Sequence, residues 1–164
     1  MNINILGQSA KQLAIEELSI FIDAQATALK IQGWKYFTTD KAPESFKALK
    51  GQTIGKRIPI ANYGGDTSIY GDVAINERFR FWHDVTHLKL NEGFSKQGEY
   101  AVVEQHLLEA ERYGLSPLAM AILRIDTKGQ VDYYFRHKEF VQNQDAFLDT
   151  CLLRGTDLAI KVKH

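Results

Sequence analysis

Two histidines four residues apart are the side chains of this chain best placed to do chemistry together. His83 and His87 lie in a segment with helical periodicity, and residues at i and i+4 are about 5 to 6 Å apart on one face of a helix. Both imidazoles can therefore converge on a single cation. Half-buried helix histidines that bond to backbone or water would show the same spacing, and this alternative stays open.

An acidic partner is expected from the helix that follows. Glu99 lies as far after Gly93 as His87 lies before it. In an antiparallel helical hairpin that turns at Gly93, the two side chains therefore sit at the same height. Two imidazoles and a carboxylate suit Zn²⁺ and can also hold Fe²⁺ or Mn²⁺, with zinc the first choice. The alternative is an acidic residue that is favoured in the first turn by the helix dipole alone.

Two further residues are candidates for roles beside the metal. Asp84 is rotated by about 100° from His83 around the helix axis. It could be a fourth ligand, an acceptor that orients an imidazole, or a general base, although a solvent-facing aspartate would look the same. His106 follows Glu99 on the same helix face, about 10 Å further along the axis, where it could transfer protons or hold a second ion. The predicted metal ligands are thus His83, Asp84, His87 and Glu99, and the predicted catalytic residues are Asp84 and His106.

This motif resembles one that characterises a known family. His83-Asp84-Val85-Thr86-His87, followed after eleven residues by Glu99, has the HDxxH-x11-E form of the zinc-ligand motif of the Coq4 family of ubiquinone-biosynthesis proteins. The flanking segments are also similar, namely Phe79-Arg80-Phe81-Trp82 before the motif and Gly98-Glu99-Tyr100-Ala101-Val102 at its end. The resemblance implies a helical architecture and the four ligand positions. Members of the family are longer, membrane-associated and tied to isoprenoid quinone intermediates.

Three functions are consistent with these residues. The first is a metal-dependent enzyme that acts on a small organic substrate, because zinc or iron can activate water for hydrolysis or polarise a carbonyl. The second is an accessory domain in which the metal is structural, and the third is a Coq4-like protein that binds a hydrophobic ligand. An open coordination position favours catalysis, and a closed four-ligand site favours a structural role. Peptidase activity is disfavoured, because Asp84 is one methylene shorter than the glutamate of HExxH peptidases.

Composition limits the class of protein. The chain has 164 residues, 45% of them hydrophobic, and 20 basic residues balance 20 acidic ones. We therefore expect one globular domain over residues 1–164 and no global field that would recruit nucleic acid. The single cysteine, Cys151, and an N-terminus (MNINILGQSAKQ) without signal-peptide features predict a reducing, cytoplasmic setting. No apolar run is long enough for an integral membrane segment. The frequency of two-fold oligomers alone suggests a homodimer.

Apolar periodicity and capping residues predict an all-α helical bundle. The expected helices run from Ser9 to Ile31, from Pro43 to Gly51, from Val73 to Leu90 after the cap Asp72, from Ser95 to Tyr113 before Gly114, and onward from Ser116-Pro117 to Arg154. Glycines and turn residues between positions 51 and 71 predict a long ordered loop. Residues 123–135 fit a helix best, with a small β-hairpin as the alternative.

Overall fold

The computed structural model describes residues 3–164, with side chains from residue 9 onward. Met1 and Asn2, the first residues of the N-terminal stretch discussed above, lie outside the described residues. The elements in chain order are α1 (Ile3–Ile31), β1 (Lys35–Thr39), α2 (Phe46–Gln52), β2 (Arg57–Ala61), α3 (Val73–Leu90), α4 (Lys96–Tyr113), α5 (Pro117–Arg124), the π-helix η1 (Ile125–Gly129), α6 (Gln130–His137), α7 (Gln144–Arg154) and α8 (Thr156–Ala159). The fold is therefore mostly helical, as predicted, with one small two-stranded sheet.

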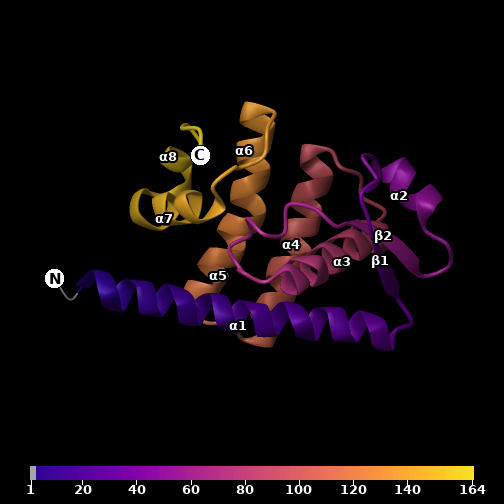
Figure 1. The fold of residues 1–164 in the computed structure, drawn as a ribbon, viewed down its shortest axis with the longest axis horizontal. Helices are drawn as coiled ribbons and strands as arrows, with labels where there is room; N and C mark the ends of the chain where they lie inside the picture. Colours follow the sequence, from indigo (N-terminus) through magenta and orange to yellow (C-terminus); the bar gives the residue numbers. More distant parts are fainter. Residues whose placement is uncertain (1–2) are drawn as a thin grey trace.

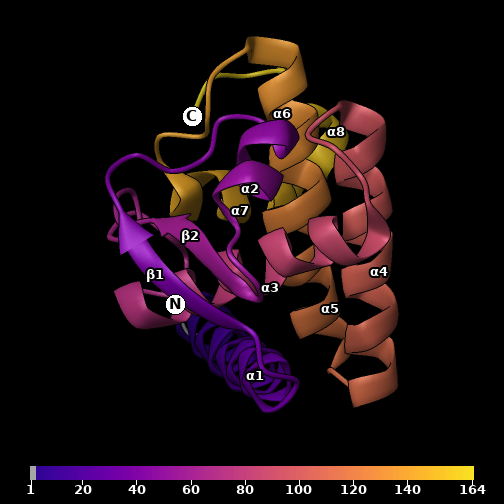
Figure 2. The same cartoon turned by 90° about the vertical axis from the view of Figure 1, so that its right-hand side faces the viewer.

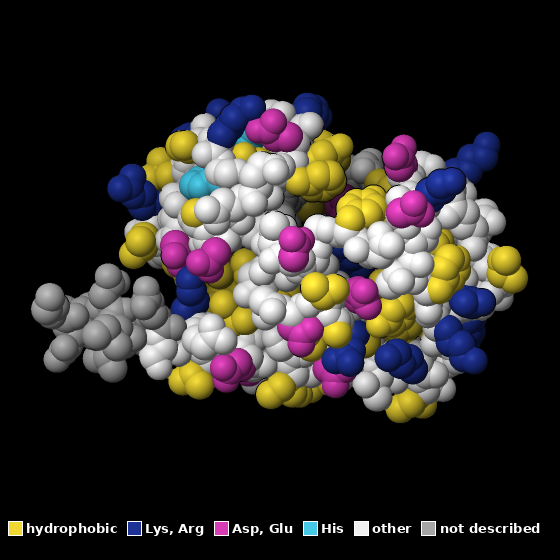
Figure 3. Space-filling model, viewed as in Figure 1, with side chains coloured by type: hydrophobic (Ala, Val, Ile, Leu, Met, Phe, Trp, Pro, Cys, Tyr) yellow, Lys and Arg dark blue, Asp and Glu magenta, His cyan; other side chains and the backbone are white. Residues whose placement is uncertain are grey.

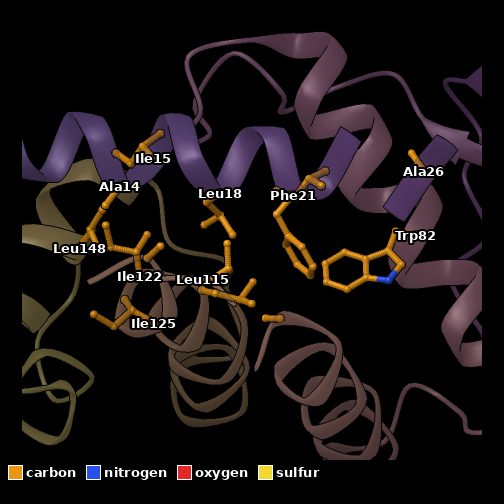
Figure 4. Close-up of a cluster of buried hydrophobic side chains, with 14 of the residues drawn as sticks. Ala14, Ile15, Leu18, Phe21, Ala26, Trp82, Leu115, Ile122, Ile125 and Leu148 are labelled. Carbon is orange, nitrogen blue, oxygen red and sulfur yellow. The ribbon is translucent and has the colours of Figure 1, made fainter. Parts of the chain in front are cut away.

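The long helix α1 runs along one side of the molecule and carries much of the core (Figure 1). Its first half packs toward α5 and α7, while its second half packs against α3 (Figure 4). Leu18 and Phe21 are fully buried, and the Phe21 ring meets Trp82 edge to face at a centroid distance of 5.3 Å. Full burial of such side chains contributes about 1.5 to 3 kcal/mol each. This packing gives α3, the helix of the two histidines, a rigid support.

Helices α3, α4 and α5 begin at the residues expected from the sequence. The Asp72 side chain accepts a hydrogen bond from the Ala74 N–H, and Ser95 and Ser116 cap α4 and α5 in the same way. Each cap satisfies a backbone donor that the first helical turn leaves unpaired. Helix α4 ends at Tyr113, and Gly114 directly after it adopts a φ of +88°. The predicted bounds of the two helices that carry the motif are thereby confirmed.

The stretch between residues 123 and 135 is helical, so the hairpin alternative is wrong. Helix α5 continues through the π-turn η1 into α6, and the three form one column beside α4 (Figures 1 and 2). Ile122, Ile125 and Tyr133 are buried, which follows the spacing of a helix face. Apolar burial at that spacing outweighs the turn-like composition of the segment.

The predicted loop between residues 51 and 71 contains a strand. β2 pairs in parallel with β1, in a register that runs from Lys35 opposite Arg57 to Thr39 opposite Ala61, and α2 lies in the connection between them. Ile58 and Ile60 are fully buried. The prediction failed here because five residues that include Pro59 carry almost no periodic signal. The proline is tolerated because a two-stranded sheet leaves each strand one edge without a partner strand.

Two helix starts differ from the prediction. Helix α1 begins at Ile3, so Ser9 lies inside the helix and is not its cap. No residue between these positions forces the backbone out of the helical conformation. Helix α2 begins after Ser45, whose side chain accepts from the Ala48 N–H, and Pro43 lies before it.

No helix in the described part of the chain is both long and apolar enough to cross a membrane.

Candidate metal centre

The side chains of His83, His87 and Glu99 converge between α3 and α4. Their ligand atoms all lie within 4.8 Å of one another. His83 Nε2 is 3.1 Å from His87 Nε2, and Glu99 Oε2 is 3.3 Å and 3.5 Å from these two atoms respectively. In a tetrahedral zinc shell with bonds of about 2.0 to 2.1 Å, two ligand atoms are about 3.3 to 3.4 Å apart. The three predicted ligands thus already have the mutual spacing that one cation requires.

Helix α3 presents His87 with its Nε2 lone pair toward the site. The ring is fully buried, and its Nδ1 lies 2.9 Å from the backbone oxygen of Glu92. A carbonyl oxygen can only accept, so Nδ1 carries the proton and donates it. Nε2 of the neutral ring is then free to bind a cation. The Phe94 ring packs against the imidazole of His87 at a centroid distance of 4.9 Å and helps to fix the orientation of the imidazole.

The turn between the helices brings Glu99 to the histidines. Gly98, the residue before it, lies so close to the turn that a Cβ there would be 2.0 Å from the backbone oxygen of Gly93. No side chain fits that gap, so the approach of the first turn of α4 requires glycine. The N–H of Gly98 donates to Ser95 Oγ and anchors the same turn. Sequence reasoning used Gly93 as the turn but gave Gly98 no role, because a glycine inside a helix rarely reveals a close approach.

Helices α3 and α4 cross steeply instead of forming the antiparallel hairpin that we expected (Figures 1 and 2). Trp82 Nε1 donates to Glu109 Oε2 at 2.8 Å, which ties α3 to the second half of α4. His87 and Glu99 still meet because both are close to the turn. Further from the turn, an equal distance in sequence from Gly93 no longer predicts which residues of the two helices are neighbours.

The crossing places His106 beside His83. His106 is fully buried, its Nε2 is 3.3 Å from His83 Nδ1, and its ring lies 3.7 Å from that of Trp82. It is not part of the group that could hold the cation. Burial, reinforced by the positive charges of His83 and His87, holds the pKa of His106 well below its ordinary value. The ring is therefore neutral and contacts a ligand from behind.

Asp84 stands outside the three-residue group. Its side chain is half-buried on α3. Burial raises its pKa to about 6, although the charges of His83 and His87 act in the opposite direction. The described residues thus bring three of the four predicted ligands together, and Asp84 is not among them.

Electrostatic attraction between the imidazoles and the carboxylate of Glu99 holds the three side chains together. Burial acts to lower the pKa of His83, but the hydrogen bond and negative charge of Glu99 outweigh it and raise that pKa. Burial acts to raise the pKa of Glu99, yet the hydrogen bonds from His83 and His87 lower it to about 2. A proton on the imidazoles thus neutralises the carboxylate, and a bound cation would replace that proton.

One side of the group reaches solvent. The side chains of His83 and Glu99 are 22% and 17% exposed, whereas that of His87 is 0% exposed. Figure 3 shows a hollow between the part of the surface formed by α6 to α8 and the part formed by α2, with acidic side chains visible at it. In the same view, the end of α3 and the start of α4 lie in this region (Figure 1). A small molecule could therefore approach the group from the side on which His83 and Glu99 are exposed.

Comparison with protein-family models, with curated proteins and with solved structures found no match.

Proposed function

We propose that this protein binds one divalent cation through His83 Nε2, His87 Nε2 and the carboxylate of Glu99. The observation that carries the proposal is the mutual spacing of 3.1 to 3.5 Å among these atoms. It matches the distance between ligands around one small cation. Two imidazoles and a carboxylate favour zinc, with iron and manganese as the alternatives.

We further propose that the cation serves an enzyme acting on a small organic substrate. Three protein ligands are typical of catalytic zinc sites, in which a fourth position stays open, whereas structural sites use four. When bound, the cation would supply Lewis-acid chemistry. Asp84, which follows His83 on α3 and has a pKa raised to about 6, could exchange a proton with a substrate near neutral pH. His87 would hold its ring fixed through Glu92, and Glu99 would offset the positive charge.

A Coq4-like protein that binds a hydrophobic ligand is the second candidate. It is favoured by a groove of about 570 Å³ along α4 and α5, where Leu107, Leu115 and Met120 contribute apolar surface. None of the three metal-site residues lines this groove. The groove is therefore separate from the proposed cation site, and the enzyme is the stronger proposal.

Elemental analysis of the purified protein tests the proposal. We expect close to one equivalent of zinc, iron or manganese, and we expect His83→Ala and His87→Ala to lose it. His137→Ala is the matched control, because His137 bonds to the backbone oxygen of Ile160 and is not in the group. Full metal retention in both His83→Ala and His87→Ala would refute the metal site.

Cobalt substitution separates catalysis from a structural role. The visible spectrum of the Co²⁺-loaded protein should change when imidazole or azide is added, because an open position accepts a further ligand. A spectrum that stays unchanged at saturating imidazole would show a closed shell. That result would favour the structural role and leave metal binding itself intact.

A further inference from the structure

His106 has a contact that the metal site explains better than packing does. Its Nε2 lies 3.3 Å from Nδ1 of His83, on the side of the ring opposite to the Nε2 that faces Glu99. The His106 ring is fixed by Trp82 at a centroid distance of 3.7 Å and by Phe79 at 6.2 Å. A buried imidazole is thus held with one nitrogen directed at a predicted ligand.

We infer that His106 is a positioning residue, which accepts a hydrogen bond from His83 Nδ1 and so keeps the His83 Nε2 lone pair available to the cation. The inference rests on the proposed metal binding. Ligating histidines commonly donate their second N–H to an acceptor that fixes the tautomer and orientation of the ring. His87 has such an acceptor in the Glu92 carbonyl. His106 is the corresponding acceptor for His83.

The two acceptors differ in one important respect. The Glu92 oxygen can only accept, whereas an imidazole nitrogen accepts or donates according to its tautomer. If His83 Nε2 binds the cation, its proton must be on Nδ1, and His106 Nε2 must be without one. The proton of neutral His106 is then on Nδ1. That atom is buried and has no hydrogen-bond partner among the described residues.

When His83 is neutral, the metal-free protein can adopt the opposite arrangement. His106 Nε2–H then donates to His83 Nδ1, and His83 Nε2–H donates toward Glu99 Oε2 or His87 Nε2. This arrangement leaves His106 Nδ1 unprotonated, so that no N–H is buried without a partner at that atom. Cation binding therefore reverses the direction of the hydrogen bond between the two rings.

Two substitutions separate hydrogen bonding from packing. His106→Phe keeps an aromatic ring against Trp82 but removes the acceptor, and His106→Gln keeps an acceptor oxygen near the position of Nε2. We expect zinc affinity, measured by competition with a chromophoric chelator, to fall about 10- to 100-fold in His106→Phe. His106→Gln should recover most of that loss. His137→Gln, which changes a histidine remote from the group, is the control. Wild-type affinity in His106→Phe, or an equal loss in both His106 variants, would overturn the inference.

Nitrogen-15 NMR of the histidine rings gives a readout that packing alone would not change. In the zinc-loaded protein we expect protons on Nδ1 of His83, His87 and His106, with His106 Nε2 unprotonated. In the metal-free protein, at a pH at which His83 is neutral, the proton of His106 should move to Nε2. A proton on His106 Nε2 in the loaded protein would refute the inference. If the wild type binds no zinc, the proposed function and this inference both fail; if it binds zinc and His106→Phe binds equally well, this inference alone fails.

Discussion

Glu99, in the first turn of α4, and Asp132, on α6, belong to two acidic clusters, and only the first of these clusters could hold a metal ion. Glu99 faces His83 and His87, whereas its neighbour Tyr100 donates its hydroxyl to Asp132, on α6. The pKa of each carboxylate is lowered because charged or polar donors outweigh the effect of burial, which acts to raise it. A lowered pKa by itself therefore does not distinguish the two clusters.

The partners of the two carboxylates differ in chemistry. Asp132 is bonded by Lys128 at 2.7 Å, with Lys96 at 3.5 Å, and both ammonium groups lie over the Tyr100 ring. An ammonium group has no lone pair to offer a cation, so this cluster is complete as an ion pair. Imidazoles near neutral pH can lose a proton and become ligands. The Glu99 cluster can thus exchange a proton for a metal, and the Asp132 cluster cannot.

The largest expected effect is a difference in zinc affinity between variants of the two carboxylates. Glu99→Gln should weaken zinc binding by more than about 100-fold, because loss of a ligand exceeds the 10- to 100-fold cost of losing a partner behind one. Asp132→Asn should leave the affinity unchanged. Isothermal titration of both variants measures this difference. Similar losses in the two would mean that zinc does not distinguish the clusters.

Acid unfolding of the metal-free protein should depend on Glu99. The pKa of this residue is about 2 in the folded protein against an ordinary value of 4.5. Its ionised form therefore stabilises the fold above pH 4.5, and this contribution is lost as the pH falls toward 2. The loss amounts to up to about 3 kcal/mol. The free energy of unfolding, measured in urea at several pH values, should fall less steeply with decreasing pH in Glu99→Gln than in Asp132→Asn. The same pH dependence in both variants would contradict the ion pair of Glu99 with the two histidines.

Gly98→Ala should disturb the Glu99 side of α4 through sterics alone. The added Cβ would lie 2.0 Å from the Gly93 oxygen, so the turn must shift, at a cost of about 1 to 3 kcal/mol. Zinc affinity should fall as Glu99 moves away from the histidines. Gly51→Ala is the matched control, because a Cβ there meets no atom within 4 Å. Equal stability of the two variants in urea would show that the close approach is not required.

The smallest effect is expected at the Asp132 cluster. Lys128 is 46% exposed, so its ion pair is screened by water and contributes no more than about 1 kcal/mol. Lys128→Ala should change the midpoint of thermal unfolding slightly and leave zinc affinity intact. A marked loss of zinc would show that the two clusters are coupled through the first turn of α4.

Local patterns in the sequence determined the helices around the site and three of its residues. Asp72 and Ser95 mark the starts of α3 and α4, and Gly114 marks the end of α4. These positions are predictable because capping depends on the residues close to the helix end. The pairing of His83 with His87 follows from helix geometry alone, and Glu99 was within reach because it follows a short turn. These predictions needed no knowledge of distant contacts.

Tertiary structure decided the rest. The pairing of β1 with β2 joins residues far apart in the chain, and no local periodicity encodes it. The packing of α1 against α3, together with the Trp82 to Glu109 hydrogen bond, accompanies the steep crossing of α3 and α4. That crossing places His106 behind His83, while Asp84 stays outside the ligand group. Sequence spacing specifies which side chains share a helix face, but only the packing of one helix on another determines which atoms meet.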